Sequence, residues 1–458
     1  MRTPKGRQTS RRKFLRRSTA FAAMACWGPF FLVPHRAEAG RKKLRILQWK
    51  HFVPGYDRWF DEVLAKEWGE KHDTKVIVDH VDVDKLRGVA AAEAAARTGH
   101  DLVMFPSPPA AFEKDVIDHR EIYRTLRHHW GEAIELAHKS TFNPRTKKYF
   151  AFSDSYLPAA FACLRDPWVG AGLPFGPFDY DTLRSVGRKI REASGIPCGI
   201  GLAQELSSNI ALHAILWSFG GVVQDEHGQV AINSKSTIEA LKYVKMLYEE
   251  CEGPEVLTWK TSSNAQALLS GRVSCAMNAI SVSRIAEKKQ PQRSGRIMLS
   301  PALRAHSGAL APPHITQCYV VWDFAENKEG AKQFLVDLVG NFMQLFKASE
   351  FCNFPCFPKT VPDLLNQLSN DSRAVPPGKY GVLRDSLLWT KNVGYPGYAT
   401  AGVDEVVSSF VIPRMFARVA KGEVRAEESA QQTETEVRAI LSKWESARTD
   451  SRQGLSSC

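Results

Sequence analysis

The stretch RILQWKHFVPGYDRWFDEVLAKEW, residues 45–68, changes its hydrophobic period halfway along. Alternating apolar residues at its start are typical of a β-strand, and apolar residues at helical spacing after it indicate an amphipathic helix. Between the two lies Trp49-Lys50-His51-Phe52, a cluster that is costly to leave in a loop unless something binds there. The stretch therefore predicts a strand, a helix and a ligand contact at their junction.

The next hundred residues continue the alternation of strand and helix. KVIVDHV (75–81) and DLVMF (101–105) read as strands, and the alanine-rich segment 84–97 reads as the helix between them. Strands joined by helices of this length run parallel, and open parallel sheets bind ligands beyond the carboxyl ends of their strands. Those ends are Trp49-Lys50-His51, Asp79-His80 and Phe105-Pro106-Ser107.

A second half of the chain repeats this mixture of elements. Strands are expected at 196–203, 272–280 and 318–324. Helices are expected at 209–219, 329–347 and over most of 404–446, and a capping box at Ser236 predicts the start of one more helix. The eight cysteines after residue 39 form no C-x-x-C or zinc spacing, so no metal or other cofactor is predicted. Cys352 and Cys356 are the one candidate pair for a local disulfide, with two free thiols as the alternative.

The first 39 residues have the pattern of a twin-arginine signal peptide. Arg11-Arg12-Lys13-Phe14-Leu15 is followed by an apolar run and by Ala37-Glu38-Ala39, an A-x-A cleavage site. We expect export to the periplasm and cleavage before Gly40. A retained membrane anchor and a lipid-anchored Cys26 are the alternatives, but the apolar run is shorter than the roughly 20 residues that span a bilayer.

The signal peptide also carries most of the positive charge. The whole chain has 61 basic and 49 acidic residues, and residues 1–39 contain nine of the basic residues and one of the acidic residues. The chain after residue 39 therefore has 61 − 9 = 52 basic and 49 − 1 = 48 acidic residues, a net charge of +4. So small a charge gives no reason to expect nucleic acid or an anionic membrane as a partner.

Four stretches carry a resemblance to a known family: QWKHFVPGYDRWFDEVLAKEWGEKHDTKVIVDHV (48–81), WSFGGVVQDEHGQVAINSKSTIEALKYVKMLYEE (217–250), ENKEGAKQFLVDLV (326–339) and NVGYPGYATAGVDEVVSSFVIPRMFARVAKGE (392–423). They resemble the extracellular solute-binding proteins, family 1, of ABC importers, which include maltose-binding proteins. Where the family often has a Pro-Gly-rich segment before its late strand, this chain has LSPALRAHSGALAPP, residues 299–313. That departure bears on the local loop and on ligand choice.

The resemblance implies an α/β, two-lobed periplasmic-binding-protein fold, each lobe a mostly parallel sheet flanked by helices, joined by hinge strands. Residues 40–151 plus 279–325 would form lobe 1, and 152–278 plus 326–458 lobe 2, with hinge crossings near 151–155, 278–281 and 322–326. It implies a monomer that closes around its solute and is then recognised by the permease subunits.

The candidate binding residues are those at the expected mouth that suit a sugar. Aromatic rings cover its C–H faces, and polar side chains hydrogen-bond its hydroxyls. The rings are Trp49, Tyr156, Trp217, Trp322 and Tyr395, and the polar candidates are His51, Asp79, Ser107, Asp154, Asn209 and Asn278. Core packing is the alternative for the rings, and capping or a turn for the polar residues.

Two other functions compete with sugar binding. The same fold could bind a polyamine or another small solute. Asp79, Asp154 and the tryptophans would then contact the polyamine. An exported hydrolase or lyase acting on glycans is the other, but the sequence has no G-x-S-x-G, no H-E-x-x-H and no P-loop. We therefore expect a binding protein and not an enzyme.

Overall fold

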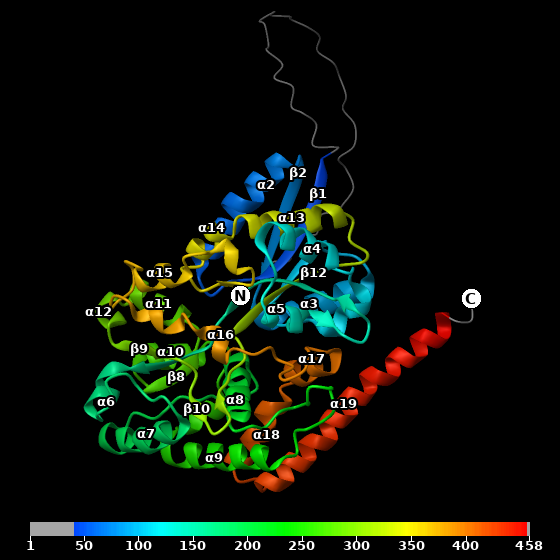
Figure 1. Cartoon of the computed structure of the whole chain (residues 1–458). Helices are drawn as coiled ribbons and strands as arrows, with labels where there is room; N and C mark the ends of the chain where they lie inside the picture. Colours follow the sequence, from blue (N-terminus) through cyan, green and yellow to red (C-terminus); the bar gives the residue numbers. More distant parts are fainter. Residues whose placement is uncertain (1–40, 456–458) are drawn as a thin grey trace, which may run out of the picture. The chain divides into compact units, whose positions relative to one another are not determined.

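The computed structural model describes residues 41–455, with side chains up to residue 446, so the predicted signal peptide lies outside the described residues. Within this range the chain builds two main sheets flanked by helices (Figure 1). We call the six-stranded sheet and the helices packed on it the first lobe, and the three-stranded sheet with its helices the second lobe. The α/β class agrees with the sequence.

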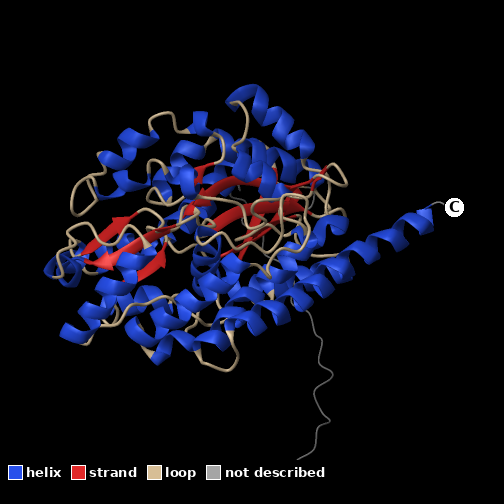
Figure 2. Ribbon diagram, turned by 60° about the horizontal axis from the view of Figure 1, so that its bottom comes forward, coloured by secondary structure: helices blue, strands red, loops and turns tan. Residues whose placement is uncertain are grey.

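The six-stranded sheet has the order β13-β6-β12-β3-β1-β2. Its strands are β1 (Lys42–Trp49), β2 (Thr74–Val81), β3 (Leu102–Phe105), β6 (Phe152–Leu157), β12 (Ile315–Val321) and β13 (Phe354–Pro355). Parallel pairing of β1 with β2 and β3 confirms the predicted β-α-β-α-β order, and β12 pairs antiparallel with both β3 and β6. Figure 2 shows the strands lying between layers of helices.

Helices cover both faces of this sheet. They are α1 (Pro54–Trp59), the π-helical η1 (Phe60–Ala65), α2 (Lys66–Lys71), α3 (Val83–Ala96), η2 (Ala110–Asp115), α4 (Arg120–Trp130), α5 (Glu135–Thr141), α13 (Lys328–Gly340), α14 (Phe342–Ala348) and η4 (Pro358–Thr360). A short hairpin, β4 (Phe142–Asn143) and β5 (Lys148–Tyr149), follows α5. Trp68 on α2 donates its indole N–H to Asp337 on α13 over 2.9 Å. α13 therefore belongs to the first lobe, although residues 326–458 were expected in the second.

The smaller sheet has the order β8-β7-β9. β7 (Ala160–Leu164) pairs antiparallel with both β8 (Cys275–Asn278) and β9 (Ile297–Ser300), so this sheet is antiparallel. The first sheet is mixed: β1 pairs parallel with β2 and β3, whereas β12 with β3, β12 with β6 and β13 with β6 are antiparallel, so neither sheet has the expected mostly parallel pairing. The remaining elements of the second lobe are α6 (Arg165–Gly170), α7 (Tyr180–Ser194), α8 (Leu206–Ser218), α9 (Lys235–Cys251), η3 (Pro254–Leu257), α10 (Ser263–Ser270), α11 (Ser281–Lys289), α12 (Pro291–Ser294), β10 (Arg304–Ala305), β11 (Gly308–Ala309), α15 (Leu364–Ser369), η5 (Lys379–Leu383) and α16 (Ser386–Trp389).

The chain crosses between the sheets at places that differ in part from the expected hinges. Consecutive strands β6 and β7 lie in different sheets, so the first crossing is at 158–159, close to the expected 151–155. The chain returns at 310–314 and leaves again after η4, not at 278–281 or 322–326. Each of those two stretches leads into a helix, α11 or α13, that packs back on its own lobe.

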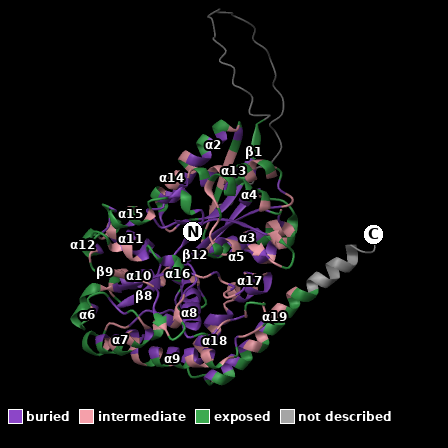
Figure 3. Ribbon diagram, in the orientation of Figure 1, coloured by how far each residue is buried: buried purple, intermediate pink, exposed green. Residues whose placement is uncertain are grey.

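Three helices end the chain where one long helical stretch was expected. They are α17 (Ala401–Ser408), α18 (Val411–Ala420) and α19 (Ala426–Leu455). Phe410, in the left-handed backbone region with φ 55°, separates the first two. α18 packs on α8 and α9, while α17 packs on η2 of the first lobe. Figure 3 shows α18 mostly buried and α19 with a long exposed side.

Several local expectations need correction. Residues 196–203 form no strand and contribute one bridge, Cys198 to Glu252. The cap of α9 is Ser234, which accepts from the N–H of Thr237, and not Ser236. Cys352 and Cys356 are buried free thiols, so the alternative to a disulfide holds. Across residues 41–455 we find no helix with the length and apolarity to cross a bilayer.

Candidate functional site

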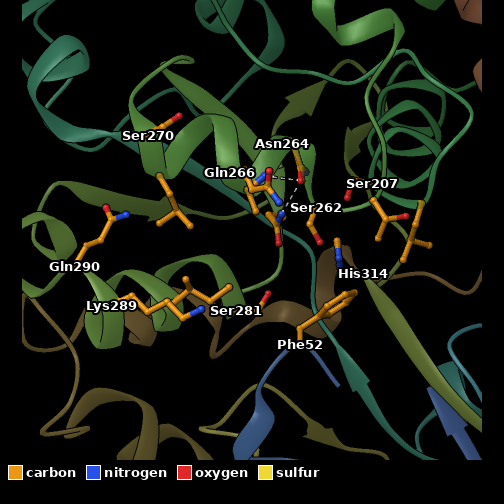
Figure 4. Close-up of a pocket in the computed structure, with 16 residues that line it drawn as sticks. Phe52, Ser207, Ser262, Asn264, Gln266, Ser270, Ser281, Lys289, Gln290 and His314 are labelled. Carbon is orange, nitrogen blue, oxygen red and sulfur yellow. Dashed lines mark hydrogen bonds between the residues drawn. The ribbon is translucent and has the colours of Figure 1, made fainter. Parts of the chain in front are cut away.

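A hollow of about 470 Å³ lies between the carboxyl end of β1 and the helices α10 and α11 (Figure 4). Phe52, from the loop after β1, and His314, just before β12, line it from the first lobe. The other lining residues come from the second lobe: Leu206, Ser207, Thr261, Ser262, Asn264, Ala265, Gln266, Leu269, Ser270, Asn278, Ser281, Ile285, Lys289 and Gln290. The hollow is therefore shared between the lobes, at the strand end that the sequence indicates.

The first lobe presents two rings to the hollow. Phe52 and His314 meet edge to face with their ring centroids 5.8 Å apart, as Figure 4 shows at one side of the hollow. The backbone N–H of His314 donates to the carbonyl of Leu157 over 2.7 Å, which fixes the residue beside the first crossing. Phe52 offers an apolar face, and the imidazole offers a donor and an acceptor.

His314 lacks the partners that a buried imidazole normally has. Its Nδ1 is buried and has no hydrogen-bond partner among the described residues. Burial lowers the pKa of His314 to about 4, so the ring is neutral at physiological pH. An unsatisfied buried polar atom costs about 1–3 kcal/mol. At the wall of a hollow, that cost is relieved when a ligand or water supplies the missing bond.

Asparagine side chains form the opposite wall. Asn264 on α10 donates to the carbonyl of Met277 over 3.0 Å, and its Oδ1 accepts from Asn278 Nδ2 over 3.2 Å. Asn264 is thus held in one orientation and in turn fixes Asn278. The Oδ1 of Asn278 has no partner in the described part of the chain, and remains able to accept a hydrogen bond from a ligand.

The start of α8 and the turn before α10 bring hydroxyls to the same space. Glu205 caps α8 and accepts from the backbone N–H of Ser207 over 2.7 Å, which places the Ser207 hydroxyl at the hollow. Ser262 holds a left-handed backbone with φ 70°. Such a conformation costs roughly 1 kcal/mol or more in a non-glycine residue, and strain of this kind clusters at binding sites.

The lining is almost uncharged. Lys289 is its one charged residue, and it is exposed at the edge. No aspartate or glutamate belongs to the lining residues, although Asp84 of α3 reaches the rim and accepts from the Thr261 hydroxyl over 2.9 Å. That bond joins the two lobes at the mouth. A lining of hydroxyls, carboxamides and two rings suits a neutral ligand rich in hydroxyl groups.

Of the eleven residues predicted from the sequence, Asn278 alone lines this hollow. Trp49 and His51 lie behind Phe52: Trp49 packs on it with centroids 5.1 Å apart, and His51 bonds Asn353 over 3.0 Å. Both are buried, so they support the wall and do not reach the space.

Asp154 and Tyr156, on β6, lie inside the first lobe. Asp154 is fully buried, accepts from the Ser155 hydroxyl over 2.8 Å and leaves Oδ2 without a partner among the described residues. Burial raises its pKa to about 7. The hydroxyl of Tyr156 lies 3.1 Å from that of Ser386. Trp322, likewise buried, donates to Glu93 over 3.2 Å and stacks on Phe324.

The remaining predicted residues are dispersed. Asn209 donates to the carbonyl of Val407 over 2.9 Å, and Trp217, two turns further along α8, packs against Tyr395 with centroids 5.4 Å apart. Asp79 is exposed on β2 and lies 3.0 Å from His100. Ser107 lies in the loop after β3 and is partly buried. These side chains share no site.

Sequence reasoning missed His314, Phe52 as a lining ring, and the 261–270 segment. One signal was available for His314: it directly follows residues 299–313, the stretch that departs from the family pattern. For Asn264 and its neighbours no comparable signal exists, because a short polar helix looks like any exposed helix. Among the described residues, no cluster of His, Cys, Asp and Glu is arranged to hold a metal ion.

Solved structures of several binding proteins share this fold. A sugar transporter protein of Arthrobacter chlorophenolicus A6 with bound laminaribiose has a TM-score of 0.71 at 14% identity, covering 87% of this chain and 99% of that one. A maltose-bound protein of T. maritima gives 0.70 at 18%, with 87% and 99% covered. An acarbose-binding receptor of Streptomyces glaucescens gives 0.67 at 16%, with 88% and 99% covered.

The likeness to these structures confirms the two-lobed fold expected from the sequence. No curated protein matches the chain. The bacterial extracellular solute-binding protein family matches residues 54–344, which is more than half of the sequence. The resemblance noted in the sequence is thereby confirmed, and the chain belongs to the bacterial extracellular solute-binding proteins.

Proposed function

We propose that the protein captures a sugar or sugar-like polyol in the hollow between its lobes and delivers it to an ABC importer. The observation that carries this is the chemistry of the lining, which offers many neutral donors and acceptors and two rings but no carboxylate. Each hydrogen bond to a ligand hydroxyl contributes about 0.5–1.5 kcal/mol, so several are needed for a micromolar affinity near −8 kcal/mol. The neighbours crystallised with laminaribiose, maltose and acarbose support the same class of solute.

The proposed mechanism is closure of two lobes around the solute. Phe52 and His314 belong to the first lobe, and Asn278 and Ser207 to the second, so a bound solute contacts both. A ligand shifts a conformational equilibrium only by its differential affinity for the two states, and contacts made to both lobes at once exist only in the closed state. The permease subunits would then recognise and bind the closed form.

The proposal also covers the boundaries of the lobes, the export of the protein and its oligomeric state. The packing described above favours residues 41–157 plus 314–360 as the first lobe and 160–309 plus 364–446 as the second. Residues 1–39 would direct export by the twin-arginine route to the periplasm, where the protein would act as a monomer. We further propose that the protein performs no catalysis on its solute.

Calorimetric titration with laminaribiose, maltose, tagatose, ribitol and spermidine tests the proposal. We expect saturable binding of at least one carbohydrate or polyol, with the sugar recovered unchanged by chromatography. Asn278→Ala should weaken that binding about 2- to 10-fold, because it removes one hydrogen bond of about 0.5–1.5 kcal/mol. Gln229→Ala, an exposed carboxamide in the second lobe, is the matched control and should bind like the wild type.

Each contrary result has a defined meaning. Binding of spermidine without any carbohydrate would replace the sugar by a polyamine, which the missing carboxylates argue against. Cleavage of a glycan would make the protein an enzyme. Silence across the whole panel, with no rise in melting temperature for any compound, would reject solute capture in this hollow.

A further inference from the structure

A second, larger hollow lies on the first lobe, where two of its lining rings, His138 and Phe142, also contact Tyr398. Its volume is about 770 Å³, and it shares no lining residue with the hollow described above. Helices α4 and α5 and the β4–β5 hairpin enclose it; the two helices are labelled in Figure 1. We call it the basic hollow, because four cations line it: Arg120, Arg124, Arg127 and Lys147.

The arginines point to one place because of their spacing. Positions 120, 124 and 127 are i, i+4 and i+7 on α4 and therefore share one face of that helix. Lys147 comes from the turn of the hairpin, and Arg120 donates a hydrogen bond to its backbone carbonyl. That contact ties the hairpin turn to the helix and keeps the cations around the same space.

Carboxylates neutralise only part of this cluster. The two acids of the lining, Glu132 and Glu135, pair with Arg127 over 2.7 Å and with Lys139 over 2.9 Å. Within the described residues, Arg124 and the Lys147 ammonium have no carboxylate partner. Arg120 meets Asp118 over 3.5 Å, but its Nε is buried without any hydrogen-bond partner. An unsatisfied buried guanidinium N–H is a donor that an anion can use.

Aromatic rings form the uncharged part of the wall. His138 Nδ1 lies 3.0 Å from the hydroxyl of Tyr149, and the His138 ring stacks on Phe142 with centroids 4.9 Å apart. Burial lowers the pKa of His138 and raises that of Tyr149, so both are neutral at physiological pH. The hollow thus combines guanidinium groups, which suit phosphate and carboxylate oxygens, with ring surface that suits an organic body.

We infer that the basic hollow is a second binding site, for a small organic anion that carries a phosphate or several carboxylates. Its volume lies within the 300–1,000 Å³ typical of pockets for small molecules. Arg124 and Lys147 supply charge that nothing in the fold uses, and Arg120 Nε supplies a directed donor. The two hollows share no lining residue, so substitutions in one leave the lining of the other unchanged.

Calorimetric titration of the purified protein with glucose 6-phosphate, citrate, inorganic phosphate and glucose tests the inference. We expect glucose 6-phosphate or citrate to bind, and the binding to weaken as salt rises. Arg124→Gln/Lys147→Gln should reduce that affinity at least about tenfold, because it removes two charged hydrogen-bond donors. Arg58→Gln/Lys189→Gln, which removes two exposed cations elsewhere, is the matched control and should bind the anion like the wild type.

Three outcomes would overturn the inference. The first is no binding of any anion. The second is anion binding that Arg124→Gln/Lys147→Gln leaves unchanged, and the third is anion binding lost in Lys289→Gln, which would place the anion in the sugar hollow. Titration of the same variants with the sugar that the wild type binds separates the two sites, since Arg124→Gln/Lys147→Gln should leave that affinity as it is.

Discussion

Arg87 on α3 and Asp404 on α17 form a bidentate ion pair, with Nη1 to Oδ1 at 2.8 Å and Nη2 to Oδ2 at 3.2 Å. Asp404 is buried and also accepts from the backbone N–H of Ala111 over 2.9 Å, while Arg87 is about one-third exposed. The contact fastens the C-terminal helices to the first lobe next to the mouth, where Asp84 bonds Thr261.

We predict that Asp404→Asn lowers the free energy of unfolding by about 1–3 kcal/mol, because a charge-assisted, largely buried pair loses one partner and Arg87 is screened only in part. Urea unfolding of variant and wild type measures it. Asp166→Asn is the control, since Asp166 pairs with Arg296 where both side chains are 60% exposed. A loss for Asp404→Asn no larger than for this control would show that the pair does not hold α17 in place.

The β-α-β-α-β run of the first lobe was predictable because each element there has its own hydrophobic period. β2 and β3 begin and end within one residue of the segments read from the sequence. The site was less predictable. The local pattern located the end of β1, but it did not show which residue near that end faces the hollow. Trp49 and His51 were therefore predicted to contact the ligand, whereas Phe52 lines the hollow.

Long-range contacts explain the other misses. His314 meets Phe52 from 262 positions further along the chain, and no local period encodes that meeting. Trp217 and Asn209 were chosen for their chemistry, but their face of α8 is covered by Tyr395 and by α17, which return late in the sequence. A buried indole and a ligand-binding indole have the same local sequence signature.

His314 provides the sharpest test of the sugar hollow. We predict that His314→Phe, which keeps a ring of similar size but removes both nitrogens, weakens sugar binding about 2- to 10-fold through the loss of one hydrogen bond. His314→Ala should weaken it more, because ring contact is lost as well. Calorimetry measures both, and His227→Ala, an exposed histidine, is the control. Equal affinity of His314→Phe and wild type would leave the imidazole nitrogens without a role in binding.

The same histidine sets an expectation for pH. Burial holds the pKa of His314 near 4, so its charge does not change between pH 5.5 and 8. The gain in sugar affinity that His314 provides should therefore be constant between pH 5.5 and 8, and should decrease only in more acidic solution. A titration series in buffers of different pH, compared between wild type and His314→Phe, measures the difference. An affinity ratio that changes steeply near pH 6.5 would mean that the ring is solvated and titrates normally.

Burial of Asp154 should make the protein less stable as the pH rises, whereas burial of the histidines makes it more stable as the pH rises. Its pKa is raised by burial to about 7 from 3.8, so the folded protein holds a proton that the unfolded chain releases between those values. Its contribution to stability is complete below about pH 4 and is lost as the pH rises through 7.

Asp154→Asn should therefore gain stability relative to the wild type as pH rises from 5 to 8, with a slope of at most about 1.4 kcal/mol per pH unit. Urea unfolding at several pH values measures this difference, in which the buried histidines cancel. Asp363→Asn, an exposed carboxylate, should show no such trend. A flat difference curve for Asp154→Asn would mean that Asp154 is solvated or paired in the folded protein.

Arg284 on α11 connects the second lobe to the end of α14. Its Nε donates to the carbonyl of Glu350 over 2.9 Å, its guanidinium pairs with Glu287 over 3.0 Å and with Asp371, and it lies 3.8 Å over the ring of Tyr380. The side chain is buried, as are the carboxylates of Glu287 and Asp371.

We predict that Arg284→Met lowers the free energy of unfolding by about 3 kcal/mol or more, because removing one partner of a buried ion network leaves the others uncompensated. Lys379, 3.2 Å from Glu287, and Arg373, 3.0 Å from Asp371, limit the loss. Arg293→Gln on the adjacent α12 removes an exposed guanidinium and should stay within about 0.5 kcal/mol of the wild type. Adding Asp371→Asn to Arg284→Met should recover part of the loss, since it removes the charge of a carboxylate that has lost its buried partner and keeps only the half-exposed Arg373. A purely additive double variant would mean that Arg284 and Asp371 do not interact.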